Sequence, residues 1–173
     1  EKDDYQSVGF QGETQRYLYP LEAVGAGDST LAKAYERDAL TMIPTKSKLM
    51  PHAREVLEYL SGKYNLYILS NGFKELQSHK MRSSGIDEYF KKVVLSDDIG
   101  ILKPWPEIFH FALSTTQSEL NNSLMIGDSW ENDIVGAAGV GMHQVFYNLS
   151  GRTDLPFAPT YQITDLKDLF NFL

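Results

Sequence analysis

Short apolar runs alternate with amphipathic stretches from residue 51 to the end of the chain, and this alternation limits the folds open to the sequence. Strands are expected at 64–70, 93–95, 124–126, 144–147 and 161–163. Helices are expected at 51–63, 74–84, 104–115, 134–139 and 166–172. Such alternation is typical of βαβ units, in which helices cover both faces of a parallel sheet. The sequence therefore predicts an α/β fold with a three-layer, doubly wound, Rossmann-like parallel sheet.

The segment before this alternation has a different character. Residues 28–43 predict a single helix, because their apolar positions recur with a period close to 3.6 and Pro44 follows directly. We therefore expect two parts, a small helical segment at 1–45 and an α/β domain at 46–173.

Composition excludes several classes of function. The chain has no cysteine, which rules out disulfides, thiolate chemistry and cysteine-bound zinc and fits a cytoplasmic protein. Its 16 basic and 23 acidic residues give a net charge of -7, whereas nucleic-acid binding needs a basic surface. No apolar run reaches the roughly 20 residues of a membrane helix. We expect a small-molecule partner, and neither a nucleic acid nor a membrane.

Polar side chains follow three of the expected strands. Ser70 and Asn71 come at the end of the first strand, and Lys103 precedes the helix that comes after the second. Asp128 and Asp133 follow the third strand. Because the carboxyl ends of parallel strands meet at one edge of the sheet, we expect these five side chains to converge there.

These residue types suit a phosphoryl group and a metal ion. Hydroxyl and backbone amide groups donate hydrogen bonds to phosphate oxygens, and an ammonium neutralises their charge. Carboxylates are ligands that Mg²⁺ accepts readily. Each feature alone also has a structural explanation, as a turn, a solvated lysine or an acid at a helix N-terminus. The ordered set favours phosphoryl transfer, in which catalysis rests mainly on positioning and charge stabilisation.

Three segments resemble motifs two, three and four of the haloacid dehalogenase superfamily. They are LYILSNGF at 66–73, ILKPWPEIF at 101–109 and MIGDSWENDIVGA at 125–137. The resemblance runs from about residue 46 to the last residue, and the preceding segment resembles the tail of a helical cap. Among the branches of this superfamily, the chain is most similar to the helical-cap phosphatases, which include nucleotidases acting on nucleoside monophosphates.

The resemblance implies a role for each matching residue. Ser70 would hydrogen-bond the transferring phosphoryl oxygen, with help from the amide of Asn71, and Lys103 would stabilise charge on the nucleophile and the phosphoryl group. Asp128 would bind Mg²⁺, and Asp133 would bind it directly or through water. The implied activity is Mg²⁺-dependent hydrolysis of a small phosphate ester through an aspartyl-phosphate.

The first motif of the superfamily, an Asp-x-Asp pair after the first strand, is not found before residue 46. Asp3 and Asp4 lack the spacing and the strand, and Asp28 follows Gly-Ala-Gly. The first Asp of this motif is the nucleophile and the second is the general acid and base. We therefore expect the chain alone to be inactive. In this superfamily the first strand lies between those of motifs two and four, so two unpaired strand edges are expected.

Three explanations of the missing motif remain open. The chain, which begins at Glu1, is a fragment of a longer protein, or another chain supplies the strand, as in a swapped homo-oligomer. Alternatively, the protein has lost the motif and become a non-catalytic binding protein. Dehalogenation on the same fold is a further alternative, but two carboxylates suited to a metal favour phosphate esters.

Overall fold

The protein is described here from a computed structural model, which describes residues 18, 20–42, 45–72 and 74–173. It contains two compact units, one of Glu1–Ser47 with Lys74–Gly85 and one of Lys48–Phe73 with Ile86–Leu173. The start of the expected cap segment, residues 1–17 and 19, lies outside the described residues. The assignment of 1–45 as part of a helical cap stays a prediction.

The first unit includes the helices α3 (Ser29–Met42) and α5 (Lys74–Ser84), and residues 20–23 are also helical. The carboxylate of Asp28 accepts a 2.7 Å hydrogen bond from the backbone N–H of Thr30 and so caps the start of α3. Among the described residues, no helix is both long and apolar enough to cross a membrane.

The second unit carries all five strands of the described chain. Its elements in chain order are α4 (Ala53–Ser61), β1 (Leu66–Ser70), β2 (Phe90–Leu95), α6 (Pro106–Thr116), β3 (Leu124–Gly127), α7 (Val135–Gly139), β4 (His143–Tyr147) and β5 (Tyr161–Ile163). Short 3₁₀ turns lie at Asp87–Tyr89, Ser96–Asp98, Leu120–Asn122 and Leu166–Asn171, and a π-helical turn lies at Trp130–Ile134.

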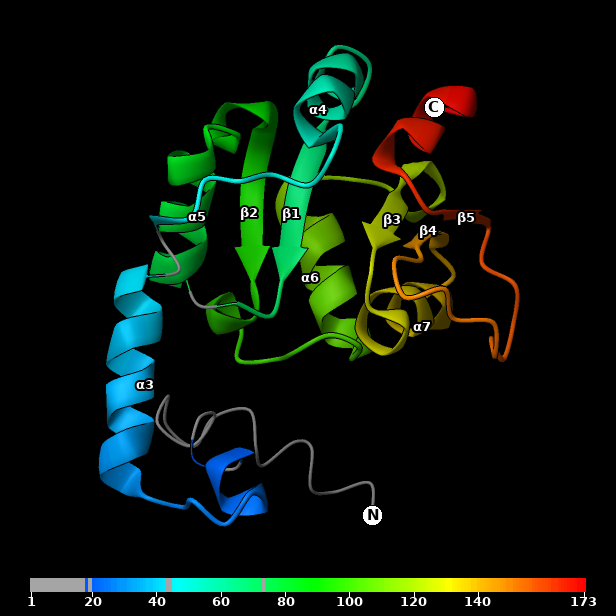
Figure 1. Cartoon of the computed structure of the whole chain (residues 1–173). Helices are drawn as coiled ribbons and strands as arrows, with labels where there is room; N and C mark the ends of the chain where they lie inside the picture. Colours follow the sequence, from blue (N-terminus) through cyan, green and yellow to red (C-terminus); the bar gives the residue numbers. More distant parts are fainter. Residues whose placement is uncertain (1–17, 19, 43–44, 73) are drawn as a thin grey trace. The chain divides into compact units, whose positions relative to one another are not determined.

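The strands form two parallel sheets, which confirms the α/β class predicted from the sequence. One sheet has the order β1-β2 and the other has the order β3-β4-β5. Within the described residues, β1 and β3 each have a ladder partner on one side only. Figure 1 shows the two groups of strands apart, with α6 between them. The two unpaired edges expected from the missing first strand are therefore those of β1 and β3.

Helices on opposite faces connect the two sheets. On one face, Val56 and Leu60 of α4 belong to a core cluster that Leu66 of β1 and Ile126 of β3 also join. On the other face, α6 buries Phe109 completely in a cluster that includes residues of both β1 and β3. Since the same helices cover both sheets, the unit has the three-layer architecture that the alternating pattern predicts.

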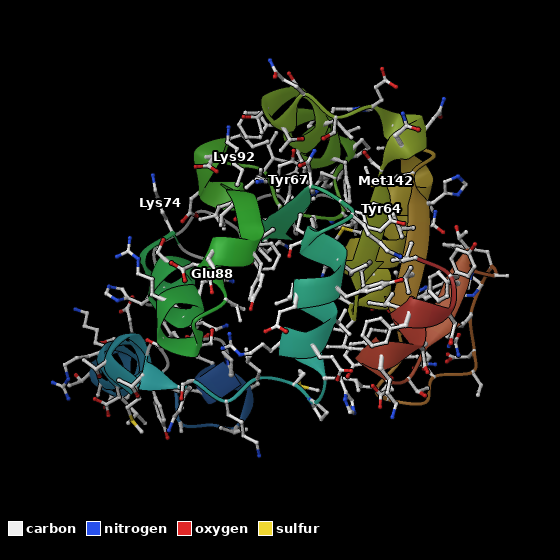
Figure 2. The ribbon with its side chains drawn as sticks, turned by 90° about the horizontal axis from the view of Figure 1, so that it is seen from above. Tyr64, Tyr67, Lys74, Glu88, Lys92 and Met142 are labelled. Atoms are coloured by element: carbon white, nitrogen blue, oxygen red, sulfur yellow. The ribbon has the colours of Figure 1, made fainter. Side chains whose placement is uncertain are left out.

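Strand β4, which lies in the middle of its sheet, is more buried than β1 and β3. In β4, which pairs on both sides, Gln144 to Tyr147 are buried, whereas every residue of β1 and of β3 is only half-buried. Figure 2 shows Tyr67 on β1 of one sheet and Met142 just before β4 of the other sheet. The apolar strands β1 and β3 thus keep surface that a further strand would cover.

Element boundaries differ from the sequence prediction at several places; for example, the strand expected at 64–70 is Leu66–Ser70 and the strand expected at 93–95 is Phe90–Leu95. The helix expected at 51–63 begins at Ala53, because His52 adopts a left-handed conformation with a φ of 62°. The helix expected at 134–139 is preceded by the π-helical turn Trp130–Ile134, which hydropathy periodicity does not reveal.

Candidate active site

Ser70 is the last residue of β1, and its hydroxyl is held in place by the turn that follows. The backbone N–H of Gly72 donates a 3.0 Å hydrogen bond to Ser70 Oγ. This bond fixes the oxygen at the carboxyl end of the strand, where the resemblance predicts a phosphoryl-binding group.

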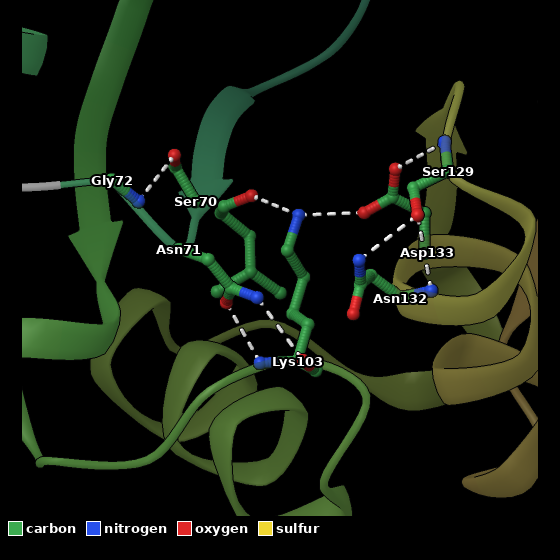
Figure 3. A network of polar contacts seen from close by, with 8 residues as sticks. Ser70, Asn71, Gly72, Lys103, Ser129, Asn132 and Asp133 are labelled. Atoms are coloured by element: carbon green, nitrogen blue, oxygen red, sulfur yellow. Dashed lines mark hydrogen bonds and ion pairs between the residues drawn. The ribbon is translucent and has the colours of Figure 1, made fainter. Parts of the chain in front are cut away.

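Lys103 brings its ammonium to the same end of β1. Lys103 Nζ lies 2.8 Å from the carbonyl oxygen of Leu69 and 2.6 Å from Asp133 Oδ1. Figure 3 shows the ammonium between these two oxygens, one from β1 and one from the turn that follows β3. The Lys103 side chain is only 10% exposed, so this ion pair is largely screened from water. The ammonium joins the β1 side of the unit to the β3 side.

Asn71 binds the backbone of the Lys103 loop. Its Oδ1 accepts a 2.7 Å hydrogen bond from the backbone N–H of Lys103, and its Nδ2 donates a 3.0 Å bond to the carbonyl oxygen of Lys103. Both bonds are drawn in Figure 3. The carboxamide of Asn71 is therefore engaged with the protein itself and only its backbone amide remains as a candidate ligand for phosphate.

Asp133 is buried, and both of its carboxylate oxygens have protein partners. Oδ1 pairs with Lys103, and Oδ2 accepts a 3.0 Å hydrogen bond from the backbone N–H of Ser129. A Cβ at Gly127 would lie 2.3 Å from Asp133 Oδ2, so only glycine leaves room for this carboxylate. The side chain of Asp133 is 6% exposed.

Asp128 follows β3 directly and is exposed. Across the described ranges no group of three or more His, Cys, Asp or Glu side chains is arranged to hold a metal. Mg²⁺ commonly uses one or two carboxylates, several waters and substrate phosphate oxygens, so it does not require such a group. An exposed carboxylate at the end of β3 fits a metal bound in this way.

The structure brings four of the predicted residues together. Hydrogen bonds and an ion pair join Asn71, Lys103 and Asp133 in one network, and Ser70, which is bonded to Gly72, is the chain neighbour of Asn71. Asp128 lies next in sequence to Ser129, which donates to Asp133. The network also contains groups that the sequence analysis did not identify. These are the carbonyl of Leu69, the amide of Ser129 and the gap left by Gly127. Of these, only the glycine directly before Asp128 is a visible signal in the sequence.

A second ion-pair cluster lies beside the π-helical turn. Arg152 donates to Glu131 over 2.5 Å and to Asp154 over 3.2 Å, and its guanidinium lies 5.7 Å from the ring centroid of Trp130. The hydrogen bond from Arg152 lowers the pKa of the Glu131 carboxyl below its ordinary value. This cluster attaches the loop after β4 to the turn that contains Asp133.

The fold is that of a hydrolase family with a parallel-sheet core. Residues 4–141 match the family described as "Hydrolase: haloacid dehalogenase-like hydrolase". The match covers well over half of the chain, and the chain belongs to the haloacid dehalogenase-like hydrolases. The resemblance found in the three sequence motifs is confirmed, and so is the class of enzyme, a hydrolase.

Several relatives have been described under their own names. The putative HAD-hydrolase YfnB of Bacillus subtilis is 29% identical over 174 residues, which are 99% of this chain and 70% of YfnB. The pyrimidine 5'-nucleotidase YjjG of Escherichia coli is 31% identical over 126 residues, 72% of this chain and 56% of YjjG. The glyceraldehyde 3-phosphate phosphatase of Pyrococcus abyssi is 38% identical over 99 residues, 57% of this chain and 42% of that enzyme.

The solved structures agree with the sequence relatives. The crystal structure of YfnB bound to magnesium superposes with a TM-score of 0.81 and 27% identity over 92% of this chain and 70% of YfnB. In the sequence comparisons, the chain spans 70% of the length of YfnB, 56% of YjjG and 42% of the Pyrococcus phosphatase.

Proposed function

We propose that this chain carries the phosphate-binding and metal-binding half of a Mg²⁺-dependent phosphohydrolase that acts on a small phosphate ester. The observation that carries the proposal is the buried ammonium of Lys103, held at the carboxyl end of β1 beside Ser70. The relatives named as a nucleotidase and a phosphatase support a phosphate ester, and YjjG supports a nucleoside monophosphate as one candidate.

In this proposal the chain's own residues bind and orient the phosphoryl group. The Ser70 hydroxyl donates to one phosphoryl oxygen, because its Oγ is held in place by the N–H of Gly72. The Lys103 ammonium, with two of its three protons directed at Leu69 and Asp133, directs the third toward the phosphoryl group and neutralises its charge. The backbone amide of Asn71 is the second donor.

Asp128 would hold the Mg²⁺ directly, since its carboxylate is exposed at the end of β3. Asp133 would reach the ion through a water molecule, because both of its oxygens already accept hydrogen bonds from the protein. When bound, Mg²⁺ would neutralise negative charge on the phosphate oxygens.

In this proposal the nucleophile is not one of the 173 residues. None of the 173 residues forms an Asp-x-Asp pair, and an aspartyl-phosphate requires such a carboxylate. We propose that a strand ending in Asp-x-Asp lies between the unpaired edges of β1 and β3 in the active protein. A second copy of this chain, in a homo-oligomer, could cover these edges but would not supply the missing acids.

Hydrolysis of p-nitrophenyl phosphate in the presence of Mg²⁺ tests this proposal. The 173-residue chain should show no turnover above the buffer rate, because it lacks the nucleophile. A version extended at its N-terminus by an apolar strand ending in Asp-x-Asp should hydrolyse the ester.

Two variants of the extended version make the test specific. Asp128→Asn should reduce turnover at limiting Mg²⁺ and raise the Mg²⁺ concentration needed for half-maximal rate, while Asp87→Asn, a carboxylate in a separate 3₁₀ turn, should leave both unchanged. Turnover by the unextended chain that survives repeated purification would contradict the proposal. Phosphate binding without turnover by a correctly folded extended version would support the non-catalytic alternative instead.

A further inference from the structure

The side chain of Asn71 has a place in this site that the phosphate-binding scheme does not assign. We infer that Asn71 is a positioning residue, whose carboxamide fixes the backbone of Lys103 so that the ammonium lies beside Ser70. This inference deepens the proposed function and rests on it for the identity of the ligand, a phosphoryl group. It concerns a different property, the placement of Lys103, which is measurable without catalysis.

The geometry holds Lys103 at both of its ends. At the backbone end, Asn71 accepts from the Lys103 N–H at 2.7 Å and donates to its carbonyl oxygen at 3.0 Å. At the side-chain end, the carbonyl of Leu69 accepts from Nζ at 2.8 Å. Leu69 and Asn71 are the two neighbours of Ser70 in sequence, so both ends of the lysine are set relative to that serine (Figure 3).

Only a carboxamide of this length can make both backbone bonds. It carries a donor and an acceptor on one planar group, which matches the N–H and C=O of a single residue. Aspartate offers two acceptors, so one of its oxygens would face the Lys103 carbonyl oxygen in repulsion. Alanine makes neither bond, and glutamine places the group one methylene further out.

A flexible lysine without this support would bind phosphate less well. A lysine side chain that is not pre-organised loses rotamer entropy when it is held in one geometry. In a preorganised site, this cost is met on folding and not on binding. Asn71 therefore acts through Lys103 and does not itself need to touch the substrate.

The same two-bond arrangement occurs once more in the second unit and provides a matched control. Asn148, which is 3% exposed, donates from Nδ2 to the carbonyl oxygen of Arg152 over 2.8 Å. Its Oδ1 accepts from the backbone N–H of Arg152 over 2.9 Å. Replacing either asparagine removes equivalent bonds, but only one of them supports Lys103.

The test compares Asn71→Ala and Asn71→Asp with Asn148→Asp in the full 173-residue chain. The first readout is the Nζ–H signal of Lys103 in a ¹H–¹⁵N spectrum, together with hydrogen exchange of its backbone amide. Both Asn71 variants should shift or broaden the Nζ signal, and Asn71→Ala should speed exchange of the Lys103 amide by about tenfold or more, the equivalent of one hydrogen bond of about 1.4 kcal/mol. Asn148→Asp should leave both signals unchanged while lowering the unfolding midpoint. If Asn71→Ala does not fold, the isosteric Asn71→Asp variant carries the test.

The second readout is binding of inorganic phosphate in the presence of Mg²⁺, followed by the same spectra. The Asn71 variants should bind phosphate about tenfold more weakly than the unmodified chain. The reason is that the charge-assisted contact of the Lys103 ammonium with phosphate is lost. An unchanged Lys103 signal in both Asn71 variants would overturn the positioning role, whatever phosphate does. In a third outcome, the Lys103 signal changes in the Asn71 variants, but neither the variants nor the unmodified chain bind phosphate. This result would support the positioning role and reject the proposed function.

Discussion

The central interaction at the scale of single residues is the ion pair between Lys103 and Asp133. Their side chains are 10% and 6% exposed, and the Nζ–Oδ1 distance is 2.6 Å. A buried pair of this kind is held by further hydrogen bonds, here from the Ser129 N–H and to the Leu69 carbonyl. Removing one partner leaves an uncompensated charge away from water, which is costly even where the intact pair contributes little net stability.

Asp133→Asn should therefore lower the free energy of unfolding by about 3 kcal/mol or more, as measured by urea denaturation of the 173-residue chain. Asp154→Asn is the matched control. Its side chain is 85% exposed beside Arg152, and the same substitution should change stability by less than about 0.5 kcal/mol.

A double-mutant cycle separates the pair from its surroundings. Lys103→Met combined with Asp133→Asn removes both charges, so the double variant should lose less stability than the sum of the two single losses. Strict additivity of the two losses would show that the two side chains do not interact across the site.

The types and order of the site residues could be predicted from the sequence, but their internal contacts could not. Ser70, Lys103 and Asp133 were placed at one sheet edge because strand ends share an edge in parallel sheets. The bonds of Asn71 to a backbone 32 residues away depend on the loop conformation, for which the sequence has no periodic signal. Hydrogen bonds to backbone groups, such as the Leu69 carbonyl, are equally invisible in residue identities.

At the scale of elements, the close approach of α7 to α6 sets the position of the turn that carries Asp133. A Cβ on Gly136 would lie 2.6 Å from two ring atoms of Phe109 and 3.0 Å from Pro104 Cα. Gly136 therefore allows α7 to pack directly against α6 and against the residue that follows Lys103.

Gly136→Ala should destabilise the chain by about 1–3 kcal/mol, because a fully buried ring has to move to accept the added methyl group. Gly139→Ala is the control in the same helix, since its Cβ would meet nothing within 4 Å. This second change should be neutral or stabilise by up to about 1 kcal/mol, because alanine favours the helix. Thermal unfolding of both variants measures the difference, and equal effects would contradict the packing role of Gly136.

Element types were predictable because period and composition carry them. All five strands form where short apolar runs occur. The predicted start of α4 at residue 51 is wrong, because the left-handed backbone of His52 is not encoded in hydropathy. The π-helical turn was missed for the same reason, since it depends on a hydrogen-bond pattern and not on apolar spacing.

For the whole molecule, the decisive feature is a parallel sheet interrupted between β1 and β3. Helices α4 and α6 pack on both sheets, yet within the described chain no strand pairs with the inner edge of either. The phosphate and metal ligands proposed above lie at the carboxyl ends of these same two strands. The interruption thus coincides with the place where the proposed function requires a nucleophilic carboxylate.

A crystal structure of the chain with Mg²⁺ and inorganic phosphate tests the central claim most directly. We predict phosphate oxygens about 3 Å from Ser70 Oγ and Lys103 Nζ, and a metal ion on the carboxylate of Asp128. Phosphate and metal bound at other positions, with the Ser70, Lys103 and Asp128 side chains unliganded at saturating concentrations, would contradict the account.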